Sequence, residues 1–210
     1  MSEHPLDLSS VSALYASNYQ ELGINSRTLG WKSVEQQKLR FDILTQYLVP
    51  QTKCDVIDYG CGFADLADFL ITDKKIDLQN YFGYEIDHSI ANQARNTLKT
   101  HSICGEISET PDIIHECDWS FVSGTFNVRV NNSAKQWERF VKQALKQLFD
   151  ASRIGLAFNC LSVFNDWYVP DLYYADPASF LGYFKKTLNG SVSLFHNYPL
   201  FEWTMIVEKR

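Results

Sequence analysis

Residues 54–70 hold the pattern that most restricts the fold of this chain. An apolar segment ends at Asp58, a turn containing Gly60 and Gly62 follows, and the next segment has helical spacing. Glycine permits positive φ and lets a ligand approach the backbone, and the first turn of a helix leaves N–H groups free. Tight strand-to-helix turns also use glycine for steric reasons alone. The pattern therefore predicts a strand–turn–helix unit that either binds a ligand or only packs closely.

Two acids near this turn restrict the ligand that it could hold. Asp58 stands at the carboxyl end of the predicted strand, where open α/β sheets bind ligands, and Asp65 follows on the first helical turn. Their carboxylates suit an ammonium group and would repel a pyrophosphate. A nicotinamide dinucleotide, and with it a dehydrogenase, is therefore disfavoured.

The rest of the chain alternates short β-branched or aromatic segments with amphipathic ones, which is typical of a sheet whose strands are joined by helices. Strands are predicted over 55–59, 79–85, 102–107, 119–123, 153–159, 192–196 and 203–207. A helix is predicted behind Ser133, because apolar residues recur at helical spacing from Trp137 to Leu148. Only residues 197–200 join the last two strands, which leaves no room for a crossover helix, so these strands should pair antiparallel.

The first 50 residues differ from the rest, since they show helical spacing in two pieces and no strand pattern before Pro50. We therefore expect an N-terminal helical cap over 1–50 and a core domain over 51–210. The fold class is α/β, a three-layer sandwich with a seven-stranded, mostly parallel sheet and an antiparallel last strand. A chain of 210 residues suits this single-domain arrangement.

A second acid follows the second predicted strand. Glu85 comes 27 residues after Asp58, and a carboxylate at this place can accept hydrogen bonds from both hydroxyls of a ribose. The alternative is a solvated acid at the end of a strand. Together with the first turn, Glu85 indicates a nucleoside-binding site.

Composition excludes several other classes of protein. The chain has 19 Lys and Arg against 25 Asp and Glu, for a net charge of −6, so we expect no nucleic-acid partner. No apolar segment reaches the roughly 18 residues that span a bilayer, and residues 1–5 lack the features of a signal peptide.

Five cysteines without a CxxC pair fit neither a disulfide framework nor a zinc site. We expect a cytoplasmic protein with reduced thiols, no metal and no membrane contact. The oligomeric state is left open.

These motifs resemble those of the class I S-adenosylmethionine-dependent methyltransferases. The segment 58–62 (DYGCG) is similar to the first motif of that family, acid-x-Gly-x-Gly, and the segment 83–87 (GYEID) is similar to its second motif. The resemblance covers about residues 50–210 and includes the seven-strand order with a closing antiparallel strand. It departs from the family at Ala64, where a third glycine is common.

The resemblance implies S-adenosylmethionine as the cofactor and roles for particular residues. Residues 58–62, which include Cys61, would surround the methionine part of the cofactor, Glu85 would bind the ribose, and Ile86 would lie against the adenine. The third motif, usually a Gly-Asp pair, appears as Gly105-Glu106-Ile107. Glu106 would then accept a hydrogen bond from the adenine amino group, with the Ile107 backbone beside it.

The fourth motif follows the fourth predicted strand and would lie near the transferred methyl group. It contains Ser123, Gly124 and Asn127. It is not the Asn-Pro-Pro-aromatic motif of methyltransferases that act on bases or glutamine. Asn127 is accordingly a candidate for aligning the reactants.

Arg40 and His196 are candidates outside these motifs. Related methyltransferases use N-terminal helices as a lid, and Arg40 in the cap could bind the carboxylate of the cofactor with two hydrogen bonds. It could equally be a surface residue of an amphipathic helix. His196 ends the sixth predicted strand at the edge that carries the glycine turn, and it is either a general base for a hydroxyl nucleophile or a structural residue.

The expected activity is methyl transfer to a small polar acceptor, by preference to oxygen and with a sugar hydroxyl as one candidate. The segment 159–177 supports this expectation, because aromatic residues alternate there with carboxylates in a long loop. Two alternatives remain open at this point, an N-methyltransferase of a small amine and a sensor that binds S-adenosylmethionine without reaction.

Overall fold

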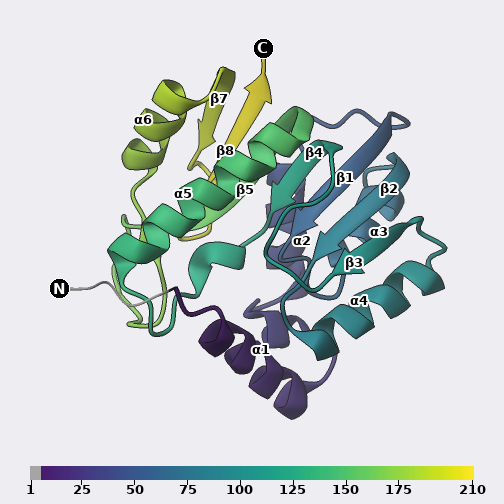
Figure 1. Ribbon diagram of the computed structural model, residues 1–210, viewed down its shortest axis with the longest axis horizontal. Coiled ribbons are helices and arrows are strands. Elements are labelled where there is room, and N and C mark those ends of the chain that lie inside the picture. The colour runs from purple at the N-terminus through teal and green to yellow at the C-terminus, as the bar shows by residue number, and fades with distance from the viewer. Residues whose placement is uncertain (1–5) are drawn as a thin grey trace.

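The computed structural model describes residues 6–210, and a mixed sheet forms its centre (Figure 1). The strand order is β3-β2-β1-β4-β5-β8-β7, and the two-residue strand β6 pairs with β5 beside this path. The bounds are β1 (Lys53–Tyr59), β2 (Asp77–Tyr84), β3 (Gly105–Ser108), β4 (Cys117–Val122), β5 (Ser152–Ser162), β6 (Tyr174–Ala175), β7 (Gly190–Phe195) and β8 (Glu202–Lys209). Each predicted strand overlaps one of these, so the predicted α/β fold class is confirmed. β6 was not predicted, because two residues are too few to show alternation.

The last strand is placed between two others. β8 pairs antiparallel with β5 over Gly155–Leu161 and with β7 over Gly190–Phe195, which confirms the antiparallel pairing predicted for the end of the chain. β7 is consequently the edge strand at the end of the sheet opposite β3. Two strands, β5 and β8, separate it from β4.

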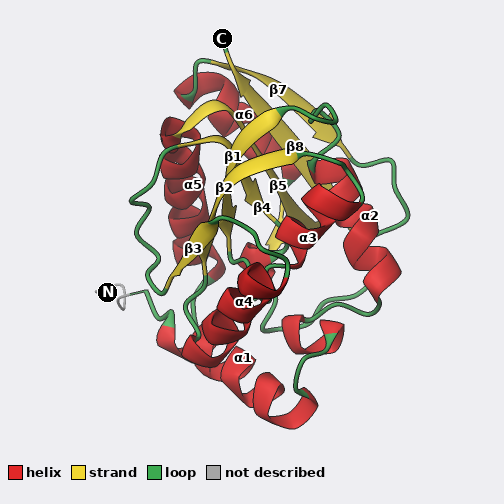
Figure 2. Cartoon of the chain, turned by 90° about the vertical axis from the view of Figure 1, so that its right-hand side faces the viewer, coloured by secondary structure: helices red, strands yellow, loops and turns green. Residues whose placement is uncertain are grey.

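Helices cover both faces of the sheet, as Figure 2 shows. α2 (Val34–Leu44), α3 (Asp65–Thr72) and α4 (His88–Thr100) bury apolar side chains against one face. α5 (Ala134–Ala151) and α6 (Pro177–Thr187) do so against the other. The predicted helix start at Ser133 is confirmed, since the Ser133 hydroxyl accepts a hydrogen bond from Gln136 N–H. Asp87 caps α4 in the same way, through Ile90 N–H at 3.0 Å.

The N-terminal region begins across the carboxyl edge of the parallel strands and ends on one face of the sheet (Figure 1). It contains α1 (Ser9–Leu22), the 3-10 helix η1 (Ser26–Leu29) and α2, and β1 begins only at Lys53. Residues 1–5 of the predicted cap lie outside the described residues. Asn132, before α5, ties this region to the core, because its side chain accepts from Asp7 N–H at 2.8 Å and donates to the Asp7 carbonyl at 2.9 Å.

Among residues 6–210, no helix has both the length and the apolar character needed to cross a bilayer.

Candidate active site

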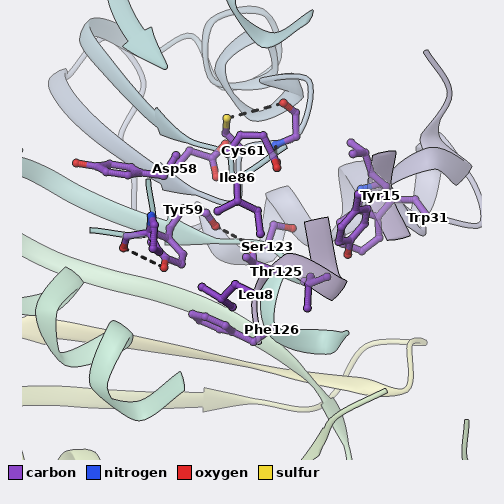
Figure 3. A pocket seen from close by; sticks show the side chains of 18 of the residues that line it. Leu8, Tyr15, Trp31, Asp58, Tyr59, Cys61, Ile86, Ser123, Thr125 and Phe126 are labelled. Carbon is purple, nitrogen blue, oxygen red and sulfur yellow. Dashed lines mark hydrogen bonds between the residues drawn. The ribbon is translucent and has the colours of Figure 1, made fainter. Parts of the chain in front are cut away.

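A cavity lies where the cap meets the carboxyl ends of β1, β2 and β4 (Figure 3). It encloses about 940 Å³ of empty space, counting the part open to solvent. Its wall is drawn from the cap, the strand ends and α5. The residues that line it are Leu8, Val11, Tyr15, Leu29, Trp31, Gln37, Phe41, Asp58, Tyr59, Gly60, Cys61, Gly62, Tyr84, Glu85, Ile86, Thr110, Pro111, Ser123, Gly124, Thr125, Phe126, Trp137 and Phe140.

The turn after β1 forms one wall of the cavity, as its sequence predicts. Gly60 and Gly62 have φ values of 78° and 55°, which few other residues adopt without strain. The N–H groups of Gly60 and Cys61 both donate to the Tyr84 carbonyl, at 2.8 and 3.0 Å. The turn is therefore fastened to the end of β2. The Cys61 thiol is buried, and this burial raises its pKa well above the ordinary value, so it is held as a neutral thiol.

Glu85 joins this turn to the residues that follow β2. Its two carboxylate oxygens accept from Gly62 N–H at 3.2 Å and from Asp87 N–H at 2.9 Å. The side chain is buried, and burial raises its pKa to about 7. Ile86 lies beside it in the wall. The structure thus brings the first two sequence motifs together in one corner, which we call the β1–β2 corner (Asp58–Gly62, Glu85 and Ile86).

Asp58 is a second buried acid in this corner. Burial raises its pKa to about 7, although the Tyr81 hydroxyl donates to it and opposes the rise. Asp65 stands nearby with a pKa raised mainly by burial, and it accepts from the Gln37 amide at 2.8 Å. None of the described residues that line the cavity is Lys, Arg or His. The corner therefore carries unneutralised acids, which suit a cationic ligand.

This charge pattern gives a test of whether S-adenosylmethionine fits. The cofactor carries a positive sulfur and an ammonium group, together with ribose hydroxyls that a carboxylate can accept from. Buried acids without an internal cation, beside two glycines that allow close backbone approach, match those groups. The residues at the β1–β2 corner therefore fit this cofactor.

The structure does not bring Glu106 and Ile107 to the cavity. Their side chains point to opposite faces of β3. Glu106 pairs with His115, whose ring stacks on Phe82, and Ile107 is buried in the core on the α3–α4 side. The loop after β3 lines the cavity instead, through Thr110 and Pro111. The residues that resemble the third motif therefore come a few positions before those that line the cavity.

The loop after β4 forms the opposite wall. Ser123, Gly124 and Thr125 line the cavity, and Figure 3 shows Ser123 and Ile86 between Asp58 and Tyr59 on one side and Tyr15 and Trp31 on the other. The Ser123 hydroxyl is buried and has no hydrogen-bond partner within residues 6–210. An unpaired buried hydroxyl is costly, so Ser123 is suited to bonding a ligand.

Asn127 belongs to the same loop but does not line the cavity. Its side-chain oxygen accepts from Leu161 N–H at 3.0 Å, and its carbonyl accepts from Tyr173 N–H at 2.8 Å. Asn127 therefore fastens the β4 loop to the end of β5. The structure gives it the position of a supporting residue, not of one that contacts the reactants.

Arg40 also lies away from the cavity wall, although the cap around it contributes Trp31, Gln37 and Phe41. Its Nε atom lies 2.8 Å from a Glu202 oxygen, and both side chains are buried. Its guanidinium stacks on Trp31 at 4.6 Å from the ring centre. Arg40 is therefore a buried residue with a partner inside the protein, not a surface residue, and the structure does not bring it to the cavity wall. Its counter-charge comes from β8, a strand that sequence patterns could not place next to it.

His196 follows β7 at the expected edge of the sheet, but it does not line the cavity. It is exposed, and its ring neighbours Phe164 at 6.2 Å between centroids. The reason is the sheet order, since β8 is inserted between β5 and β7 and leaves β7 outermost. The expected general base is thus not brought to the site.

Several lining residues were missed by the sequence analysis. Leu8, Val11 and Tyr15 come from the start of α1, and Trp137 and Phe140 come from α5. Their spacings of three and four residues indicate an apolar helix face, but such a face usually packs in a core. Nothing in the sequence distinguished a cavity wall from a core.

Comparison with known proteins identifies the family of the chain. No family model matches the chain. The putative methyltransferase Rv1506c of Mycobacterium tuberculosis is 34% identical over 154 residues, which cover 72% of this chain and 91% of that protein. The chain therefore belongs to the same methyltransferase family.

Solved structures agree on the fold. Magnesium protoporphyrin IX methyltransferase (ChlM) from Synechocystis PCC 6803, with bound SAH, has a TM-score of 0.67 at 9% identity, and the match covers 97% of this chain and 100% of that one. An S-adenosylmethionine-dependent methyltransferase from Clostridium acetobutylicum has a TM-score of 0.61 at 11% identity, covering 93% and 97%. The chain is a class I S-adenosylmethionine-dependent methyltransferase, which decides against the sensor and the dehydrogenase.

Proposed function

We propose that this enzyme transfers its methyl group to a hydroxyl oxygen of a small, uncharged acceptor, with a sugar hydroxyl as one candidate. One observation carries the proposal. Beyond the acids of the β1–β2 corner, the cavity wall is aromatic, aliphatic or uncharged and polar, with no cationic side chain among the described lining residues. An acceptor bearing phosphate or carboxylate would find no counter-charge there. The rings of Trp31 and Phe140 suit the apolar face of a ring-shaped acceptor.

We assign the cofactor to the β1–β2 corner. Asp58, Gly60, Cys61 and Gly62 would hold its methionine part, and Glu85 would accept from the ribose hydroxyls. Ile86, with Thr110 and Pro111 of the β3 loop, would contact the adenine. Ser123 and Gly124 would face the reacting carbon. The support is the shared wall that these residues form and the absence of an internal cation for Asp58 and Glu85.

In this proposal the protein contributes mainly alignment. S-adenosylmethionine supplies a methyl group on a positively charged sulfur, which is already a good leaving group. The unpaired Ser123 hydroxyl is placed to accept a hydrogen bond from the acceptor hydroxyl and so to orient its oxygen. Holding two reactants in line can account for roughly 7–11 kcal/mol of a barrier. The new C–O bond would replace the C–S bond and leave S-adenosylhomocysteine, and the hydroxyl proton would pass to solvent, because no histidine stands among the described lining residues.

Residues 1–50 would act as the cap over this site. The support is that Leu8, Val11, Tyr15, Trp31 and Phe41 all come from that region and line the cavity. A lid of this kind excludes water from the reaction. We also place the protein in the cytoplasm, supported by five free cysteines, four of them buried.

A second candidate is N-methylation of a small amine. Asp65 favours it, because this acid stands close to Asp58 and pairs only with the neutral Gln37 amide within the described chain. Asp65 does not line the cavity, so it would act on a protonated amine through the negative charge that it adds near Asp58. The acceptor atom therefore has to be determined by the product.

The test is incubation with S-adenosylmethionine that carries a ¹³C-methyl group, against a panel of sugars, sugar nucleotides, small alcohols, phenols and amines. We expect a labelled product whose carbon chemical shift is that of a methyl ether. A methyl shift typical of nitrogen would establish the second candidate in its place. Labelling confined to protein or nucleic acid would contradict a small acceptor.

A further inference from the structure

Five residues form a closed ring of contacts between the cap and the core. Trp31 and Arg40 come from the cap, Glu202 begins β8, Asn159 lies on β5, and Gly124 follows β4. We call this set the cap junction. Its members are far apart in the sequence and meet only because of the strand order.

Each member of the ring contacts the next one. Arg40 Nε lies 2.8 Å from Glu202 Oε1, and the same oxygen accepts from the Asn159 amide at 3.1 Å. The Asn159 oxygen in turn accepts from Gly124 N–H at 2.6 Å. Gly124 has φ 69°, and a Cβ built on it would come within 2.3 Å of Trp31 Cη2. Trp31 then stacks under the Arg40 guanidinium, which closes the ring.

The charged side chains of the cap junction are buried. The Arg40 and Glu202 side chains are only 10% and 1% exposed, and Asn159 is fully buried. Taking such a pair out of water costs about as much as its attraction returns, so apolar residues of the same size would usually serve stability as well. The Arg40–Glu202 pair is therefore weak evidence for a stabilising role. Its position between the cap and the core indicates a role in holding other groups in place.

The two ends of the junction are both parts of the cavity wall. Trp31 lines it from the cap, and Gly124 lines it from the β4 loop next to Ser123. Asn159 accepts a hydrogen bond from Gly124 N–H, and Trp31 packs where a Gly124 Cβ would lie. A different shape of the β4 loop would therefore collide with Trp31 or lose the hydrogen bond to Asn159. The geometry couples the position of the cap to the position of the loop.

We propose that Glu202 and Asn159 are positioning residues, which hold the β4 loop through Gly124 and hold the cap closed through Arg40, so that the junction controls how long the cofactor stays bound. This inference rests on the assignment of the cofactor to the cavity, and it does not depend on the nature of the acceptor.

The test measures the dissociation and association rates of S-adenosylhomocysteine by stopped flow in the full chain. The double variant Arg40→Met with Glu202→Gln removes both charges and keeps an oxygen for Asn159. The matched control is Lys38→Met with Asp73→Asn, which removes an exposed ion pair that also joins α2 to the end of α3, at 3.1 Å. Melting temperatures of all three proteins are measured without ligand.

We expect the double variant to release S-adenosylhomocysteine roughly 5- to 100-fold faster, which is the usual size of coupling between two sites, with a smaller change in association. The control pair should leave both rates unchanged. Equal dissociation rates in the parent and the double variant, both folded, would overturn the inference.

A second variant keeps the inference falsifiable if the double variant fails to fold. Arg40→Lys preserves the charge opposite Glu202 and loses the planar stack on Trp31, so it should fold and still speed dissociation severalfold. Parent-like rates in Arg40→Lys would overturn the role of the Trp31 stack and the closed ring with it. A parent protein that binds no S-adenosylhomocysteine would instead overturn the cofactor assignment, together with this inference.

Discussion

The β1–β2 corner and the cap junction both bury carboxylates, and they differ in what stands opposite the charge. Glu202 of the cap junction has Arg40 at 2.8 Å, so its counter-charge belongs to the fold. Asp58 and Glu85 of the corner have only hydrogen-bond donors, and burial raises the pKa of each to about 7. A buried acid with a built-in cation organises the protein, whereas a buried acid without one leaves its charge for a ligand to balance.

Glu202→Gln is expected to show the largest effect, because it leaves Arg40 buried without a counter-charge. Removing one partner of a buried pair costs about 3–5 kcal/mol of unfolding free energy. Urea denaturation of the ligand-free protein measures it. Asp73→Asn, in the exposed pair with Lys38, is the control and should cost less than about 1 kcal/mol. Similar losses in the two variants would mean that Glu202 does not act as the built-in counter-charge of a buried Arg40.

Glu85→Ala is expected to act on binding more than on stability. It removes a carboxylate placed to accept charge-assisted hydrogen bonds from the ligand, which should weaken S-adenosylhomocysteine binding by about 1.5–3 kcal/mol in calorimetry. Glu106→Ala is the matched control, since Glu106 lies outside the cavity and pairs with His115. If Glu106→Ala weakened binding as much as Glu85→Ala, the adenine would lie on β3 after all.

The pH dependence of stability should reveal the buried acids of both regions without any mutation, because burial also raises the pKa of Glu202 in the junction. Asp58 and Glu85 have ordinary pKa values of 3.8 and 4.5, raised to about 7 in the folded protein. The ligand-free fold therefore holds more protons than the unfolded chain between about pH 4 and 7, and its stability falls as pH rises through that window.

Binding of the cationic cofactor should follow the opposite course over the same window, because it needs the ionised acids. Affinity for S-adenosylmethionine should rise as pH increases toward 7 and level off above it, with about a tenfold change per pH unit for one controlling group. Calorimetry at a series of pH values, in buffers of different ionisation heat, also measures the protons released. An affinity that stays flat from pH 5 to 8 would show that the acids are not in the binding site.

His196→Ala should have the smallest effect. The residue is exposed and outside the cavity, so unfolding free energy should change by no more than about 0.5 kcal/mol. Once an acceptor is known, the turnover number should stay within about twofold of the parent. A loss of roughly 10²-fold or more, the size expected for a missing general base, would mean that the region after β7 moves to the site during catalysis.

The sequence alone determined most of the elements, though not β6 or α6, and it determined the β1–β2 corner. Strands and helices follow from the spacing of apolar residues, and the antiparallel end follows from the shortness of the link at residues 197–200. Asp58, Gly60 and Gly62 lie within one turn, and Glu85 ends the strand that pairs with β1 in parallel register, Asp58 beside Gly83. Local geometry and a single strand pairing are enough to bring these groups together.

Only the tertiary structure decided what Arg40, Asn127 and His196 contact. The partner of Arg40 is Glu202, on a strand that is inserted between β5 and β7, and the same insertion carries His196 away from the cavity. Asn127 turns to Leu161 because β4 and β5 are neighbours. The physical reason is that side-chain spacing reports which face of an element is apolar, while the order of strands in a sheet depends on how all of the faces pack together.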